Sequence, residues 1–124
     1  MSNYKISDDA AQLLDFFVGL KKKLQGKGFH ISVKPENIKE AFGWEDARIS
    51  NAVDYLNKKS LIEVSFYLGG NFGVFNVMPY GIDLIESPEL FKSTFNVEYN
   101  AVKVDIEKVF EINPQLKASL LGIG

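Results

Sequence analysis

Near the start of the chain, apolar residues recur every three or four positions, which is the spacing of a helix with one buried face. Ser7 precedes this stretch and suits the N-cap, while Asp8 and Asp9 favour the positive end of the helix dipole. We therefore expect a first helix with Ser7 as its N-cap, with Lys21, Lys22 and Lys23 in its last turn, and with Gly26 as the residue that can end it. An alternation of apolar and polar residues over 29–33 then predicts a short strand.

Two further helical patterns follow on either side of a glycine. Pro35 suits the first position of a helix, and we expect this helix to end at Phe42. Gly43 permits the left-handed backbone that a sharp turn needs. The next helix is expected over residues 44–59, and its apolar stripe consists of Ile49, Ala52, Val53 and Leu56.

A β-hairpin is predicted next, because two β-rich runs, 61–68 and 72–78, flank a glycine-rich turn. If Gly70-Asn71 forms a two-residue type II′ turn, Phe66 faces Phe75 and Val64 faces Val77. Pro79 then opens a short helix.

The pattern changes after Ser87-Pro88. Phe95, Val97 and Tyr99 alternate with polar residues and predict a strand, whereas residues 102–112 fit both a strand and a helix. We therefore expect a first domain over residues 1–88 and a C-terminal extension over residues 89–124. The extension would contain a strand and a short helix, and would serve dimerisation or packing.

Composition narrows the functional classes. The net charge is −2, from 14 Lys and Arg against 16 Asp and Glu. The overall charge therefore does not indicate nucleic-acid binding, and only a local cluster of positive charge could do so. The chain has no Cys, no signal-peptide core and no apolar run of membrane-spanning length, which favours a cytoplasmic protein. His30 is the only histidine and lacks partners for zinc or general-base chemistry, so we expect no metal, no cofactor and no enzymatic activity.

Three motifs in this order carry a resemblance to a known family: PENIKEAFG, ISNAVDYLNKKSLIEV and NVMPYGIDLIES. They resemble the second helix with its glycine turn, the recognition helix running into the first wing strand, and the segment after the wing of winged helix-turn-helix transcriptional regulators. The resemblance covers roughly Ser7 to Ser87 and implies an α+β fold, with a three-helix core, a β-hairpin wing and here a C-terminal extension.

The resemblance also implies a function. Regulators of this family read the major groove of double-stranded DNA with the recognition helix, here helix 44–59, usually as homodimers. Bidentate hydrogen bonds would let Arg48 read guanine and Asn51 read adenine. Carried over by position, the DNA-binding candidates are Arg48, Ser50, Asn51, Asp54, Lys58 and Lys59.

Two features depart from the family pattern and favour an alternative. The wing tip LGGNFG has no Lys or Arg, and the recognition helix opens with Glu45 and Asp46, which repel phosphates. Arg48 could instead form a surface salt bridge with one of these carboxylates, and Trp44 fits the core. The alternative is a winged-helix protein-protein interaction module that does not bind DNA. Its partner-binding surface would include Tyr67, Phe72, Phe95, Val97 and Tyr99.

Overall fold

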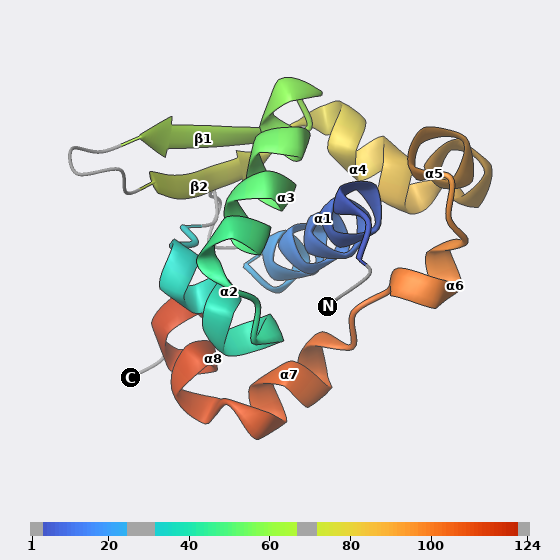
Figure 1. Cartoon of the computed structure of the whole chain (residues 1–124). Coiled ribbons are helices and arrows are strands. Elements are labelled where there is room, and N and C mark those ends of the chain that lie inside the picture. Colours follow the sequence, from blue (N-terminus) through green and yellow to red (C-terminus); the bar gives the residue numbers. More distant parts are fainter. Residues whose placement is uncertain (1–3, 25–31, 67–71, 122–124) are drawn as a thin grey trace.

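The longest helix, α1 (Ile6–Lys23), lies at the centre of the molecule and contacts elements from both halves of the chain (Figure 1). The computed structural model describes residues 4–24, 32–66 and 72–121. The last turn of α1 contains Lys21, Lys22 and Lys23, as predicted, but Ser7 is not the N-cap of the helix. The cap position is Lys5 and makes no side-chain bond, so Ser7 falls inside a first turn that Asp8 and Asp9 stabilise.

The helical pair around Gly43 is confirmed. Helix α2 (Pro35–Phe42) begins with the predicted proline and ends at Gly43, whose φ of 71° is left-handed. The backbone N–H of Lys34 donates to the Asn37 side chain at 2.9 Å, which satisfies a free donor at the start of the helix. Helix α3 (Asp46–Lys58) buries the predicted stripe of Ile49, Ala52, Val53 and Leu56.

The hairpin is present, but its predicted register is wrong. Strand β1 (Ile62–Phe66) pairs antiparallel with β2 (Phe72–Val77), and Val64 faces Val74 while Phe66 faces Phe72. Five residues, 67–71, separate the paired phenylalanines, so Gly70-Asn71 cannot be a two-residue turn between them. These five residues lie outside the described part of the chain. A bulge between Glu63 and Val64 shifts the register further.

Val33 adds a bridge to the other edge of β2. Its N–H donates to the Val74 carbonyl at 3.0 Å, and its carbonyl accepts from the Val74 N–H at 2.8 Å. The predicted strand over 29–33 is thus represented by this bridge, and residues 29–31 lie outside the described part of the chain. The fold is α+β, with helices packed around a small antiparallel sheet.

The C-terminal part is helical where it is described. After α4 (Pro79–Glu86), the chain forms α5 (Pro88–Phe95), α6 (Tyr99–Val102), α7 (Ile106–Ile112) and α8 (Pro114–Leu121). The strand predicted around Phe95–Tyr99 is therefore wrong. Phe95 ends α5, Asn96 takes a left-handed φ of 57°, and Tyr99 starts α6, so the alternation spans a helix end and a turn.

The extension packs on the rest of the chain. Helices α6 and α7 contact α1, and α8 contacts α2. Figure 1 shows the red α8 next to α2. Buried apolar residues from α1, α3, the hairpin and the extension form one cluster, which includes Phe91, Phe95, Phe110 and Leu116. None of the helices in the described part of the chain has the length and apolar composition that a bilayer crossing needs.

Candidate interaction surface

The outer face of α3 is polar, because the opposite stripe is turned into the core. Ser50, Asn51, Asp54 and Lys58 are exposed on this face, as the helical spacing predicted. Lys58 Nζ lies 3.9 Å from Asp54 Oδ1, and both side chains are largely exposed. Such a pair adds little to stability and leaves both groups available to a partner. Lys59 follows the helix, with its Nζ 5.3 Å from the ring centroid of Tyr55.

Arg48 is directed away from this face. Its Nε donates to Asp9 Oδ2 at 2.7 Å and its Nη2 donates to Asp9 Oδ1 at 2.9 Å, which joins α3 to α1. The guanidinium carbon also lies 4.5 Å from the ring centroid of Tyr4 and 4.8 Å from that of Trp44. Hydrogen bonding to Asp9 raises the pKa of Arg48, which stays charged.

The structure therefore corrects the expected surroundings of Arg48. Of the two alternatives for Arg48, base reading and a salt bridge with Glu45 or Asp46, the structure shows a salt bridge, but its partner is Asp9, 39 residues earlier in the sequence. Asp46 pairs with Lys39, at 3.4 Å. The Asp9 side chain is only 5% exposed, so Arg48 is needed to compensate a buried carboxylate. Trp44 is buried, as predicted.

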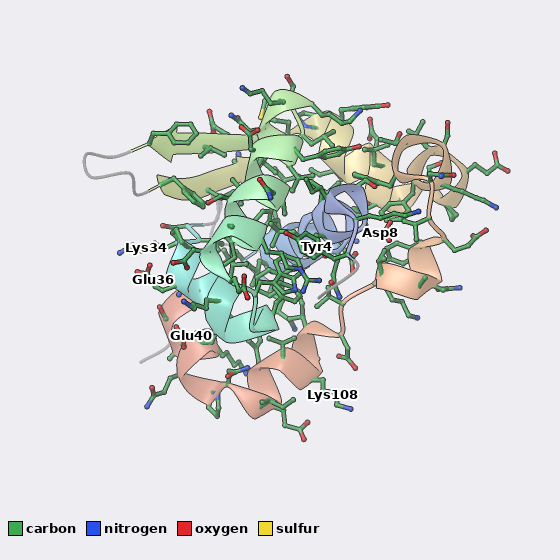
Figure 2. All side chains as sticks on the ribbon, viewed as in Figure 1. Tyr4, Asp8, Lys34, Glu36, Glu40 and Lys108 are labelled. Atoms are coloured by element: carbon green, nitrogen blue, oxygen red, sulfur yellow. The ribbon has the colours of Figure 1, made fainter. Side chains whose placement is uncertain are left out.

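The exposed charges around α2 and α3 are mixed in sign. Between residues 34 and 59 the exposed charged side chains are four lysines (Lys34, Lys39, Lys58 and Lys59) and five carboxylates (Glu36, Glu40, Glu45, Asp46 and Asp54). Figure 2 shows Lys34, Glu36 and Glu40 together along the α2 side of the molecule. This surface lacks the excess of positive charge that attracts a nucleic-acid backbone.

A groove of about 360 Å³ lies between α3 and the hairpin. Phe66 and Phe72 line one side, with ring centroids 6.4 Å apart, because they are directly paired across the two strands. Phe66 is 69% exposed, whereas Phe72 is 8% exposed. The α3 side of the groove is formed by Ser50, Asn51, Val53 and Asp54.

Sequence reasoning missed Phe66 as a surface residue. Val64 and Phe66 share one face of β1, and Val64 packs against the core. Phe66 continues the same face beyond the body of the molecule. The alternation of apolar residues in β1 shows which face they share, but not the position at which the core ends.

The predicted partner-binding residues are mostly engaged within the chain. Tyr67 lies outside the described residues, and Phe72 is buried. Phe95 is 1% exposed and tilts against Phe91, so it belongs to the core and not to an exposed surface. Val97 is half-buried against the same core.

Tyr99 fixes the extension to α1. Its hydroxyl donates to Asp15 Oδ1 at 2.7 Å, and the backbone N–H of Val104 donates to Asp15 Oδ2 at 2.7 Å. Burial, reinforced by the hydrogen bond to Asp15, raises the pKa of Tyr99 to about 12. The Tyr99 hydroxyl is therefore occupied in a contact within the chain.

A second hollow, of about 420 Å³, lies between α2 and the extension. Its lining combines the apolar side chains of Phe42 and Val109 with Glu40, Lys103 and Lys108. Figure 2 labels Glu40 on α2 and Lys108 on α7. Because both signs of charge are present, the lining does not select one class of ligand.

No metal site is evident within residues 4–24, 32–66 and 72–121, where no three potential His, Asp or Glu ligands gather in one place. Comparisons with models of known protein families, with curated proteins and with solved structures find no match.

Proposed function

We propose that residues 1–88 form a winged helix-turn-helix unit that binds another protein through the surface between α3 and the hairpin. The order of α1, the Val33 bridge, α2, the Gly43 turn, α3, the hairpin and α4 supports this fold. In this interpretation α3 corresponds to the recognition helix, and the strands β1 and β2 correspond to the wing.

The observation that carries the protein-binding proposal is the exposure of Phe66 at the mouth of the α3–hairpin groove. A phenylalanine that is 69% exposed gains free energy when a partner removes it from water. Aromatic side chains beside a pocket are also typical anchors of protein interfaces. The polar groups of Ser50, Asn51 and Asp54 on the other side of the groove would set the orientation of the partner.

Electrostatics supports the same choice. The only arginine of the chain is bound to Asp9, and the exposed charges around α2 and α3 include more carboxylates than lysines. A protein partner tolerates mixed charge at the rim of an interface, whereas a DNA backbone favours an excess of lysine and arginine.

Site-specific photo-crosslinking tests the proposal. A benzophenone amino acid at position 66 should give an adduct with a second polypeptide in cells that express the protein. The matched control is position 112, because Ile112 is 68% exposed and lies on α7, away from the groove. Equal adducts from the two positions, or none from position 66, would contradict the proposal.

A second candidate function is regulation of transcription by DNA binding as a homodimer. It is favoured by the exposure of Ser50, Asn51 and Lys58 on the outer face of α3. The amide of Asn51 can form a bidentate pair with adenine, and Lys58 can contact a phosphate. In this function α3 would carry nearly all of the sequence recognition.

Fluorescence anisotropy with mixed-sequence duplex DNA at several salt concentrations tests this second candidate. Binding that weakens as salt rises, and that weakens further in Lys58→Ala, would support it. The control is Lys117→Ala, which removes an exposed lysine from α8. Absence of binding at low salt would exclude the DNA-binding candidate and leave the protein-binding proposal intact.

A further inference from the structure

The outer edge of β1 carries hydrogen-bonding groups that point away from β2. Val74 uses both its N–H and its carbonyl to bond Val33, so neither group is directed at β1. Val64, which faces Val74, is therefore in a non-hydrogen-bonded pair, and its own N–H and carbonyl point to the outer edge. The backbone groups of Phe66, two residues further on, point the same way.

Within the described part of the chain, strand β1 is paired with β2 alone. No backbone hydrogen bond joins Val64 or Phe66 to a segment other than β2 among the described residues. Natural edge strands are commonly protected by lysine, proline or a covering segment. Strand β1 has the sequence IEVSF, with Glu63 as its single charge and with neither lysine nor proline.

We propose that this edge pairs with the same edge of a second copy of the chain. This rests on the proposed function, because it names a second copy as the partner bound beside the hairpin. In an antiparallel pair centred on Ser65, Val64 of one copy faces Phe66 of the other. The two-fold axis makes Phe66 of the first copy face Val64 of the second in the same way. The outward groups of both residues then exchange four main-chain hydrogen bonds across the two-fold axis.

The side chains of β1 are compatible with this self-pairing. Each exposed Phe66 ring would pack beside a Val64 of the other copy, which is a favourable cross-strand combination. The two Ser65 side chains would meet at the axis, and the two Glu63 carboxylates would lie on opposite ends of the pair. No like charges are therefore placed opposite each other. The contact is small, so association should be reversible and depend on concentration.

Disulfide trapping provides the first test, because the chain contains no cysteine. In the proposed pair, residue 65 is directly opposite its copy in a non-hydrogen-bonded position, at a Cα separation of about 4.5 Å. This separation suits a disulfide bond. Under mild oxidation, Ser65→Cys should form a covalent dimer about tenfold faster than a freely colliding thiol, since pairing raises the effective concentration.

The matched control is Ser93→Cys, which places an exposed thiol on α5. Equal rates of dimer formation for the two variants would overturn the proposal. Disulfide formation by Ser65→Cys mainly with a different protein would also overturn it, although the protein-binding function would then stand. Adducts from position 66 to a different protein, without faster dimer formation by Ser65→Cys, would overturn self-pairing and leave the protein-binding function intact.

Charge substitution provides a second test that needs no covalent bond. Ser65→Lys and Ser65→Glu would each place two like charges at the axis, and each variant should sediment as a monomer at concentrations where the unmodified protein dimerises. An equimolar mixture of the two variants should regain the mass of a dimer. Unchanged dimerisation of either variant alone would overturn the proposal.

Discussion

Arg48 on α3 holds Asp9 on α1 through two hydrogen bonds, of 2.7 and 2.9 Å, while its guanidinium lies near the rings of Tyr4 and Trp44. The pair therefore connects the helix with the polar outer face to the central helix of the fold. Its role in the described structure is to fix the position of α3.

Arg48→Ala should consequently destabilise the protein. The substitution leaves the buried Asp9 carboxylate without its main partner, and we expect a loss of about 1.5–3 kcal/mol in the free energy of unfolding. Urea unfolding followed by circular dichroism measures this loss. Lys39→Ala, which removes the exposed pair with Asp46, is the control and should change stability little. Equal effects of the two substitutions would show that Arg48 has no special structural role.

Two glycines should respond differently to alanine. At Gly81, an added Cβ would lie 2.7 Å from the Leu61 carbonyl oxygen, which accepts a hydrogen bond from Met78. Because that backbone group cannot move freely, Gly81→Ala should cost about 1–3 kcal/mol. At Gly19, the closest atom is the flexible Cδ1 tip of Ile106, so Gly19→Ala should cost less. Thermal unfolding of both variants tests which substitution costs more stability. A Gly81→Ala variant that is more stable than the Gly19→Ala variant would contradict the prediction.

Alanine substitutions of Phe95 and Phe66 should have different effects on stability, because Phe95 is in the core and Phe66 is on the surface. Phe95 is 1% exposed, so Phe95→Ala should lower the free energy of unfolding by about 3–5 kcal/mol. Phe66→Ala should have a small effect on folding, because the ring is mostly in water already. Combined with Ser65→Cys, Phe66→Ala should slow formation of the disulfide-linked dimer, because the ring no longer packs against the second copy. A large loss of stability in Phe66→Ala would place its ring in the core.

Tyr99 should give the protein a measurable sensitivity to high pH. The folded-state pKa of about 12 lies above the ordinary value for tyrosine, which is about 10. The folded state thus holds the phenolic proton more tightly than the unfolded state. Its stabilising contribution is complete below about pH 10 and is lost as the pH rises to about 12.

Comparison with Tyr99→Phe isolates this contribution. The variant keeps the ring but removes the hydrogen bond to Asp15, so it should be less stable at neutral pH by about 1.5–3 kcal/mol. The difference between the two proteins should shrink between pH 10 and 12, because the other titrating groups are common to both. A difference that stays constant over this interval would contradict the raised pKa.

The sequence pattern predicts structure correctly where that structure depends on residues that are close together in the sequence. The apolar stripe of α3, the proline that starts α2 and the left-handed Gly43 are all local features, and the structure confirms them. The strand predicted around Phe95–Tyr99 failed because alternation over a few residues also arises when a helix ends at a left-handed residue such as Asn96. Local pattern cannot distinguish the two cases.

Features that depend on distant contacts were not predictable in this way. The register of the hairpin depends on the length of its loop and on a bulge, and the sequence indicated neither. The partner of Arg48 is 39 positions away, and the local sequence around Arg48 offers only Glu45 and Asp46 as carboxylates. The exposure of Phe66 depends on where the body of the fold stops, which is a property of the packed molecule.

The bond network around Asp15 has a consequence for how the protein is made. Asp15 receives its two hydrogen bonds from residues 84 and 89 positions later, although α1 is among the first segments to be synthesised. Until the extension has been translated, the face of α1 that the extension covers in the native structure therefore remains exposed. Completion of the native structure should follow synthesis of the whole described chain, and a nascent chain that stalls before Tyr99 would present α1 to chaperones.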